Sequence, residues 1–147
     1  MAEEFKKAVV TGVLVRNDDG KYLLVKKANN VGPYAGTYLT PGGGVNTGEP
    51  VDEAVLRELY EETGIKVENL QRVFFDDDVT ENWQGIKRHY IMLMYTANYA
   101  SGKISQTEGN DDNFEDVNWF SADELKKMKL SPPLVKLLRH LGVLTDG

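Results

Sequence analysis

Hydrophobic and polar positions near the start of the chain form two short apolar runs separated by a turn. Residues 8–16 (AVVTGVLVR) are rich in β-branched side chains, residues 17–20 (NDDG) have turn composition, and residues 21–27 (KYLLVKK) form the second run. This pattern is typical of a β-hairpin. The stretch that follows, residues 28–38 (ANNVGPYAGTY), is rich in Gly, Pro and Asn. We predict a loop there that is long enough to have a function.

The best-marked helix of the chain lies between a proline and a glycine. Pro50 suits the first turn of a helix and Gly64 suits its C-terminal cap, so we predict a helix over residues 50–63. An apolar stripe on this helix would bury it against a sheet. The residues of the stripe are Val55, Leu59 and, in part, Leu56.

The remaining elements alternate irregularly between strands and helices. The predicted strands are residues 67–77, 87–99 and 117–120, and the predicted helices are residues 122–128, capped by Ser121, and 131–142, stopped at Gly142. A polar loop over residues 101–116 lies between the second and third of these strands. Such an order favours a layered α/β or α+β fold over a helical bundle.

Composition and charge limit the class of protein. With 147 residues and 41% hydrophobic content, residues 1–147 are expected to form a single domain. The net charge of -6 gives no basic field, which argues against nucleic acid as the main partner. The absence of cysteine excludes disulfides, thiolate metal sites and thiol nucleophiles. No signal-peptide region or apolar run of membrane-spanning length occurs, so a cytoplasmic protein without a membrane partner is expected.

Three carboxylates gather on the predicted helix. Glu58, Glu61 and Glu62 fall within about 100° of arc on a helix. In water they repel each other by roughly 0.2 to 0.5 kcal/mol per pair. Arg57 supplies one compensating charge, and a divalent cation with oxygen ligands would turn the repulsion into a binding site. The alternative is a solvated, charged helix face with no ligand. The preceding glycines, residues 42–44, allow the backbone to approach a metal ion or phosphate closely, or form an ordinary turn.

Two other motifs with similar spacing fail at their decisive positions. Gly43 to Gly48 has the spacing of a P-loop, but Glu49 and Pro50 stand where Lys and Ser or Thr are required. The acidic run at residues 76–81 has Glu81 where an EF-hand loop needs glycine. Neither a P-loop nor an EF-hand is therefore expected.

The glycine loop and the acidic helix together resemble the Nudix box, the signature of hydrolases that cleave a nucleoside diphosphate linked to another moiety. Every fixed position of the box is matched, namely Gly43, Glu49, Arg57, Glu58, Leu59, Glu61, Glu62, Gly64 and Ile65. The opening hairpin, the approach YAGTYLTPGGG and the segment VNWFSADEL also resemble Nudix counterparts, so the resemblance covers nearly the whole chain.

This resemblance implies a fold, a cofactor and a set of ligands. The implied fold is an α/β/α sandwich around a mixed β-sheet, and the implied cofactor is Mg²⁺ or Mn²⁺. Glu58, Glu61 and Glu62 would be metal ligands, with Gly42 contributing its backbone carbonyl. Arg57 would hold a glutamate in place, and Glu49 would fix the loop to the helix.

The implied reaction is in-line attack of a water on phosphorus, with the metals polarising phosphoryl oxygens and neutralising the leaving phosphate. The general base is open between two positions. Glu58 is one candidate, and an acid of the loop before Trp119 is the other. The familiar loop glutamate falls near Asn113, an amide that cannot act as a base. Asp111, Asp112 and Glu115 are close substitutes, and Asp112 is preferred among them.

The segments around the box most resemble a branch of small Nudix nucleoside triphosphatases that act on pyrimidine deoxynucleotides and release monophosphate and pyrophosphate. ADP-ribose, oxidised purine nucleotides, other nucleoside-diphosphate derivatives and a non-catalytic nucleotide-sensing module are the alternatives. Sensing modules usually lose box glutamates, and this chain keeps them all. Homodimers are common in the family, so a homodimer is a further expectation.

Substrate contacts are expected from aromatic and basic residues outside the box. Aromatic side chains that could stack on a base are Tyr34, Tyr38, Phe75, Trp83 and Tyr90. Basic side chains that could meet the phosphates are Lys27, Lys87 and Arg88. The two histidines, His89 and His140, are interpreted as structural. For each candidate, core packing or an ordinary surface charge is the alternative.

Overall fold

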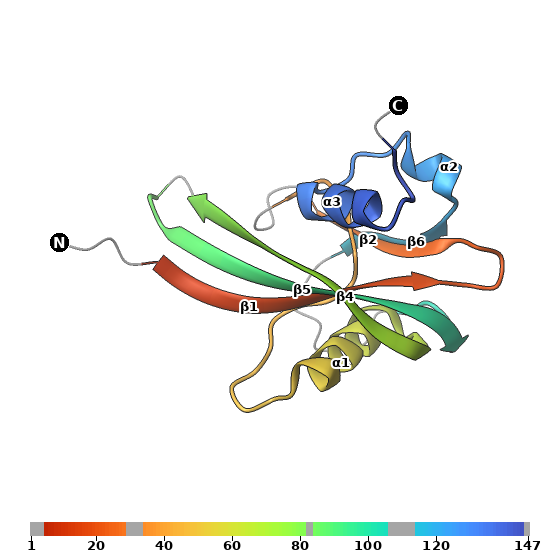
Figure 1. Cartoon of the computed structure of the whole chain (residues 1–147), viewed down its shortest axis with the longest axis horizontal. Helices are drawn as coiled ribbons and strands as arrows, with labels where there is room; N and C mark the ends of the chain where they lie inside the picture. Colours follow the sequence, from red (N-terminus) through yellow and green to blue (C-terminus); the bar gives the residue numbers. More distant parts are fainter. Residues whose placement is uncertain (1–4, 29–33, 82–83, 106–113, 146–147) are drawn as a thin grey trace.

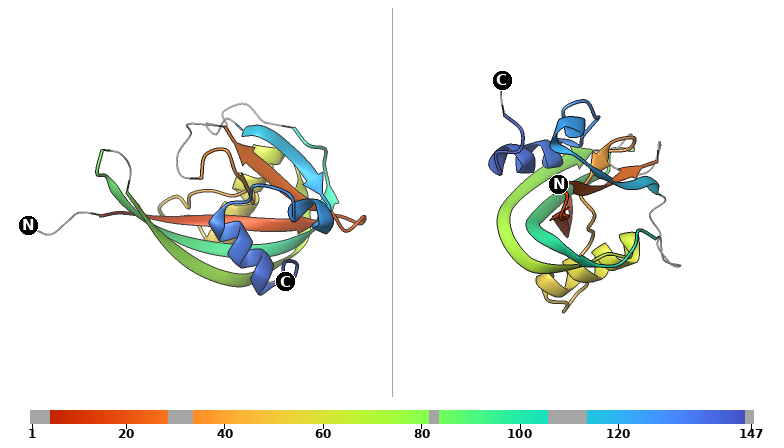
Figure 2. Two further views of the ribbon diagram at one scale, coloured as in Figure 1. Left: turned by 90° about the horizontal axis from the view of Figure 1, so that it is seen from above. Right: turned by 90° about the vertical axis from the view of Figure 1, so that its right-hand side faces the viewer.

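The protein folds around one strongly curled, mixed β-sheet (Figures 1 and 2). The computed structural model describes residues 5–28, 34–81, 84–105 and 114–145. The strands are β1 (Phe5–Arg16), β2 (Tyr22–Lys27), β3 (Tyr38–Leu39), β4 (Lys66–Glu81), β5 (Lys87–Ser101) and β6 (Phe114–Phe120), and the helices are α1 (Val51–Thr63), α2 (Ala122–Leu125) and α3 (Pro132–His140). The strand order is β3-β2-β1-β5-β4, with β6 paired to β2. β1 and β5 run parallel, and the other named pairs are antiparallel.

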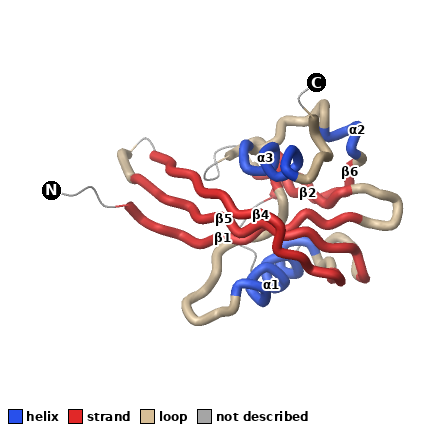
Figure 3. Tube along the Cα trace, in the orientation of Figure 1, coloured by secondary structure: helices blue, strands red, loops and turns tan. Residues whose placement is uncertain are grey.

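Helices cover both faces of this sheet. α1 lies on one face, and α2 and α3 lie on the other (Figures 1 and 3). Successive residues of β1 point to opposite faces, so Val13 and Val15 pack with α1 while Leu14 packs with α3. Residues 11–15 are accordingly all buried, as expected for a strand covered on both sides. The predicted α/β/α sandwich around a mixed sheet is confirmed.

Most predicted elements are present, and one part of the apolar stripe was wrong. The opening hairpin is formed by β1 and β2. α1 begins at Val51, directly after Pro50, and ends at Gly64, whose φ of 78° is the left-handed cap conformation. Val55 and Leu59 are buried as predicted, but Leu56 is 42% exposed because it lies on the side of α1 that faces away from the sheet. Ser121 caps α2 by accepting a hydrogen bond from the Glu124 amide.

The two edges of β1 have different partners. Along one edge, β1 pairs with β5 over its full length. Along the other, it pairs with β2 only at Arg16–Tyr22. Over residues 9–13, this second edge of β1 pairs instead with the segment of residues 41–45, through bonds such as that from the Thr11 amide to the Gly43 carbonyl at 2.8 Å. The glycine loop therefore lies directly beside the central strand, in front of α1. Among the described residues, no helix is both long and apolar enough to cross a membrane.

Candidate active site

Alternate residues of the glycine loop turn their polar backbone groups to opposite sides. The carbonyls of Pro41 and Gly43 accept hydrogen bonds from β1, at 3.0 and 2.8 Å. The Gly42 amide and the Gly44 carbonyl instead face α1. The Gly42 amide donates to Glu62 Oε1 at 2.8 Å, and the Gly44 carbonyl accepts from Arg57 Nη2 at 3.2 Å. In the part of the chain that the structure describes, no hydrogen bond uses the Gly42 carbonyl.

Two of the loop glycines are required by close neighbours. A Cβ on Gly42 would lie 2.0 Å from the Thr11 carbonyl oxygen, and Gly42 has a φ of +150° that side chains disfavour. A Cβ on Gly43 would lie 2.6 Å from Glu58 Oε2. The Glu58 carboxylate thus rests against bare backbone, a contact that a side chain in the loop would prevent.

Arg57 connects the loop to the carboxylates of α1. Its guanidinium binds both oxygens of Glu49, from Nε at 2.8 Å and from Nη2 at 2.9 Å. Nη1 reaches Glu58 at 3.0 Å and Glu61 at 3.2 Å. The hydrogen bond to Glu49, followed by that to Glu58, raises the pKa of Arg57, while the same Arg57 bond and the Asn46 amide lower the pKa of Glu49. Both partners stay ionised at neutral pH, so this pair holds residues 46–49 against the helix.

The three box carboxylates occupy different environments. Glu62 is buried, at 1% exposure, and its Oε1 is bonded to the Gly42 amide. The side chain of Glu58 is 18% exposed and that of Glu61 is 48% exposed. A gradient from buried to solvated carboxylate therefore runs across the face of α1 that meets the loop.

The donor atoms fit Mg²⁺ or Mn²⁺ in their chemistry. These ions prefer oxygen ligands, and the site offers three carboxylates beside a carbonyl at Gly42 that no described group uses. Among the described residues, no three acidic or imidazole groups are grouped closely enough to hold an ion as they stand. The contacts explain this, because Arg57 holds Glu58 and Glu61 while the Gly42 amide holds Glu62.

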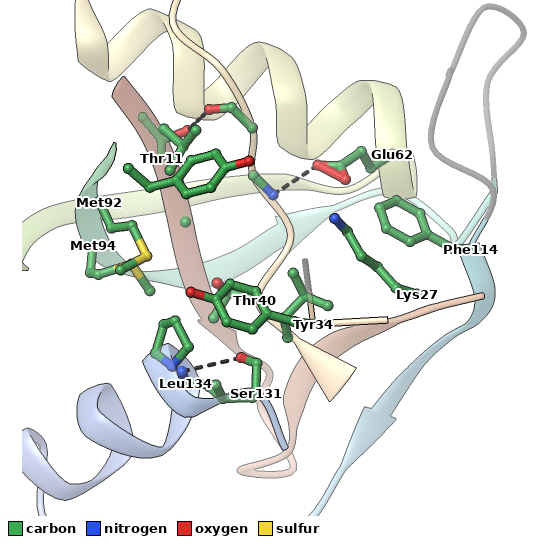
Figure 4. A pocket seen from close by; sticks show the side chains of 17 residues that line it. Thr11, Lys27, Tyr34, Thr40, Glu62, Met92, Met94, Phe114, Ser131 and Leu134 are labelled. Atoms are coloured by element: carbon green, nitrogen blue, oxygen red, sulfur yellow. Dashed lines mark hydrogen bonds between the residues drawn. The ribbon is translucent and has the colours of Figure 1, made fainter. Parts of the chain in front are cut away.

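A cavity of about 160 Å³ adjoins the loop and reaches α3 (Figure 4). Gly42, Gly43 and Glu62 line its box end, together with Lys27. The rest of its wall is largely apolar, formed by Val10, Gly12, Leu39, Met92, Met94, Phe114, Pro133 and Leu134, with Thr11, Tyr34, Thr40, Tyr90 and Ser131 adding polar atoms. The acidic helix and an apolar recess thus belong to one continuous site.

Tyr34 is the candidate substrate residue that the structure describes in most detail. It lines the cavity, and its hydroxyl donates to Asp78 Oδ2 on β4. Burial, followed by the bond to Asp78, raises the pKa of its hydroxyl. Its φ of 64° is unusual for a residue with a side chain. Thr37 supports this conformation by donating to the Tyr34 carbonyl from both its amide, at 3.1 Å, and its hydroxyl, at 2.5 Å.

The other candidate substrate residues divide into two groups. Lys27 and Tyr90 line the cavity together with Tyr34. Four others do not line the cavity, namely Tyr38, Phe75, Lys87 and Arg88. Phe75 and Arg88 are exposed on β4 and β5, and the Lys87 ammonium lies 5.5 Å from the ring centre of Phe5. The Tyr38 hydroxyl donates to Asp116 at 2.6 Å. Burial and the Asp116 bond raise the pKa of Tyr38 to about 12. Trp83 lies outside the described residues.

The loop acids before Trp119 are only partly described. Asp111, Asp112 and Asn113 lie outside the described residues, so the candidate base Asp112 has no structural account. Glu115 lies on β6 and forms an ion pair of 3.0 Å with Lys26. Both histidines have structural contacts, because His89 Nε2 is 2.7 Å from Asp77 and His140 stacks on Phe74.

Several cavity residues were not anticipated from the sequence. They come from β1, β5, the end of β3 and the start of α3, and they are Thr11, Thr40, Met92, Met94, Ser131 and Leu134. Only the alternation of Met92 and Met94 on one face of a strand was visible locally. The others meet through long-range pairing, which a local pattern does not reveal.

Comparison with known proteins places this geometry in context. A family model described as the NUDIX domain matches residues 6–141. The chain is 35% identical over 129 residues to the NAD-capped RNA hydrolase NudC of Chromobacterium violaceum, an alignment covering 87% of this chain and 43% of that protein. It is 31% identical over 134 residues to the nucleoside triphosphatase NudI of Escherichia coli O139:H28, covering 89% of this chain and 94% of that protein.

Among solved structures, the MutT NUDIX hydrolase from Burkholderia pseudomallei aligns with a TM-score of 0.76 and 31% identity, covering 92% of this chain and 98% of that chain. The chain therefore spans less than half the length of the NudC relative but nearly the whole length of the NudI relative.

Proposed function

Because the chain belongs to the NUDIX domain family, we propose that it is a divalent-metal-dependent nucleotide pyrophosphohydrolase that cleaves a deoxynucleoside triphosphate, preferably a pyrimidine one, to the monophosphate and pyrophosphate. One observation carries this proposal. Glu62, Gly42 and Gly43 of the box line the same cavity as Tyr34 and Phe114. A ligand with a polyanionic end and a flat apolar end fits such a site.

The metal-binding role is assigned to the carboxylates of α1 together with the Gly42 carbonyl. Bound Mg²⁺ or Mn²⁺ would polarise phosphoryl oxygens and lower the pKa of a water. Glu58 and Glu61 would have to turn from the Arg57 guanidinium toward the ion, while Glu49 keeps Arg57 anchored. Arg57 thus orders two of the carboxylates and limits their repulsion.

The chain's own residues assign the remaining roles. Glu58 rests against the backbone of Gly43, a residue that lines the cavity, and we assign it to accept the proton of the attacking water. Lys27 lies at the same end, where its ammonium group opposes the charge of the phosphates (Figure 4). Tyr34, Tyr90 and Phe114 provide aromatic surface for the base.

The position of cleavage follows from these roles. An acidic helix face cannot contact phosphates without cations, so the carboxylates of α1 would hold metal ions on the polyphosphate side of the site, with the base in the apolar recess. Such ions would stabilise a pyrophosphate leaving group as its charge builds up, which favours cleavage between the α and β phosphates. The near-complete alignment with the nucleoside triphosphatase NudI supports a triphosphate substrate.

A second candidate is a hydrolase of nucleoside diphosphates linked to another moiety. The 35% identity to NudC, named an NAD-capped RNA hydrolase, favours it. The cleaved bond would again be a phosphoanhydride, held by the same box residues. The two candidates therefore differ in the group beyond the phosphates and not in the chemistry.

A nucleotide panel tests both candidates. Purified protein with Mg²⁺ is incubated with dCTP, dTTP, dUTP, dATP, ADP-ribose and NAD, and products are separated by ion exchange. We expect monophosphate and pyrophosphate from the pyrimidine triphosphates, no turnover in EDTA, and none by the matched variant Glu61→Gln. Diphosphate products would contradict the cleavage position. Turnover of ADP-ribose or NAD alone would favour the second candidate.

A further inference from the structure

Of the hydroxyl side chains that line the cavity, three belong to residues that are more than nine-tenths buried. Thr11, Thr40 and Ser131 are 5%, 7% and 1% exposed. A buried hydroxyl normally has a hydrogen-bond partner, since leaving it without one loses the hydration it had in water.

Two of these hydroxyls have a hydrogen-bond partner within the fold: Thr11 donates, whereas Ser131 only accepts, and no described group accepts the Ser131 hydrogen. Thr11 Oγ1 donates to the Gly43 carbonyl at 3.1 Å, which helps to hold the glycine loop on β1. Ser131 Oγ accepts from the Leu134 amide at 3.3 Å, which caps the start of α3. The Thr40 hydroxyl differs, because it makes no hydrogen bond within the described part of the chain.

The backbone makes room for the Thr40 hydroxyl at the cavity wall. A Cβ on Gly12 would lie 2.6 Å from Thr40 Oγ1 and 3.0 Å from Met94 Cε. The hydroxyl therefore occupies space that a side chain at Gly12 would fill, next to the side chain of Met94. Thr40, Gly12 and Met94 all line the cavity, so the Thr40 side chain is part of the wall that a ligand in the recess would contact (Figure 4).

The Ser131 hydrogen is also unused among the described residues, but its oxygen is held as the N-terminal cap of α3, so Thr40, which has no hydrogen bond within them, is the polar group best placed to recognise a base. The charged lining residues, Lys27 and Glu62, belong to the box end. The Tyr34 hydroxyl is already bonded to Asp78. Tyr90 is only half-buried, so water can satisfy its hydroxyl. A buried hydroxyl with its hydrogen unused is a donor, and its complement is a carbonyl oxygen.

We propose that the Thr40 hydroxyl donates a hydrogen bond to a ring carbonyl oxygen of the nucleobase and so makes the site prefer pyrimidines to adenine. Every pyrimidine base carries a carbonyl at its 2-position, whereas adenine carries none. The inference rests on the proposed function for placing a base in the recess. It adds a specificity-determining residue, outside the box, to that site.

The test compares Thr40→Val, which replaces the hydroxyl by a methyl group of similar shape, with Thr40→Ser, which keeps the hydroxyl. Binding of the non-hydrolysable α,β-imido analogues of dUTP and dATP is measured by calorimetry with Mg²⁺. For Thr40→Val, we expect about 3- to 10-fold weaker binding of the dUTP analogue, as for loss of one neutral hydrogen bond. Binding of the dATP analogue should not change, and Thr40→Ser should behave like the wild type.

Thermal unfolding separates recognition from a structural role. Thr63 is the matched control, because its buried hydroxyl donates to the Leu59 carbonyl at 2.7 Å. Thr63→Val should lower Tm, whereas Thr40→Val should leave Tm unchanged or raise it, since no internal bond is lost. A fall in Tm for Thr40→Val would overturn the inference.

The remaining outcomes distinguish this inference from the proposed function. Unchanged binding of the dUTP analogue by Thr40→Val, or equal weakening of both analogues, would overturn the role of Thr40 and leave the hydrolase proposal standing. Thr40-dependent binding by a wild-type protein that hydrolyses no nucleotide would overturn the hydrolase and support the role of Thr40. A wild-type protein that binds neither analogue would overturn both.

Discussion

The Gly42 amide donates a 2.8 Å hydrogen bond to Glu62 Oε1, and Glu62 is 1% exposed. A carboxylate buried to this degree needs such a partner to offset its lost hydration. The bond joins the loop and the helix of the box, which are 20 residues apart in sequence. Glu62 therefore fixes the shape of the site as well as contributing charge to it.

The first prediction separates these two roles of Glu62. Glu62→Gln keeps an oxygen that can accept from Gly42 but removes the charge, so we expect turnover to fall at least 100-fold with Tm nearly unchanged. Glu62→Ala leaves the buried Gly42 amide without its acceptor, so it should also cost about 1 to 3 kcal/mol of stability. Steady-state rates and urea unfolding measure both. Near-normal turnover by Glu62→Gln would show that its charge is dispensable.

The burial of Glu62 is a feature that the sequence analysis does not predict. The sequence places Glu58, Glu61 and Glu62 on one face of α1, which their helical angles support. However, Glu62 follows Val55 by seven residues and so lies only about 20° from it around the helix. Val55 is buried against the sheet, and Glu62 is buried with it. The spacing of seven residues from Val55 indicates that Glu62 is buried, but a charged side chain is ordinarily expected to be exposed.

The second prediction concerns pH and the Glu49–Arg57 pair. The hydrogen bond from Arg57 lowers the pKa of Glu49 in the folded state. The unfolded chain therefore binds more protons as pH falls below the ordinary glutamate value, and the stabilisation by the pair is lost in that window. Wild type should exceed Glu49→Gln in stability at pH 7, and the difference should shrink below about pH 4.3. Urea unfolding of both at several pH values measures it, and a constant difference would contradict the assignment.

The third prediction addresses the general base. Glu58 rests against Gly43, which lines the cavity, and accepts a hydrogen bond from Arg57. We expect Glu58→Gln to lower kcat by about 10²- to 10⁴-fold, the usual contribution of a general base. Asp112→Asn should lower it less than about tenfold by the same measure. The reverse order in single-turnover measurements would assign the proton to the loop before Trp119.

How much of the site could be anticipated depended on whether its residues are neighbours in sequence. The box could be recognised because its loop and helix are continuous in sequence, and Gly64 indicates where the helix ends. The cavity could not be predicted, because β1 comes to lie beside β5 and residues 41–45 only in the folded chain. Tyr38 illustrates the limit. Its place in an aromatic, glycine-rich loop favoured base contact, yet its ring packs edge-on against Phe120 and lies outside the cavity lining.

The last prediction uses three consecutive glycines, residues 42–44, at which an added Cβ would meet different surroundings. Gly42→Ala places Cβ 2.0 Å from a backbone oxygen at φ +150°, and backbone cannot move aside. We expect a loss of at least about 3 kcal/mol of stability from the combined overlap and strain. Gly44→Ala meets no atom within 4 Å, so its stability and turnover should stay at wild-type values.

Gly43→Ala separates stability from activity, because the three atoms nearest to its Cβ all belong to the carboxylate of Glu58, with Oε2 at 2.6 Å. A side-chain end can turn away, so the cost in stability should be about 1 kcal/mol or less. Rotation of the Glu58 side chain displaces the carboxylate that we propose as metal ligand and base, so turnover should fall at least tenfold while Tm changes little. Urea unfolding and kcat measured on all three variants test the series. If Gly43→Ala retained full turnover, the position of Glu58 against the loop would have no part in catalysis, because the substitution cannot be accommodated without moving it.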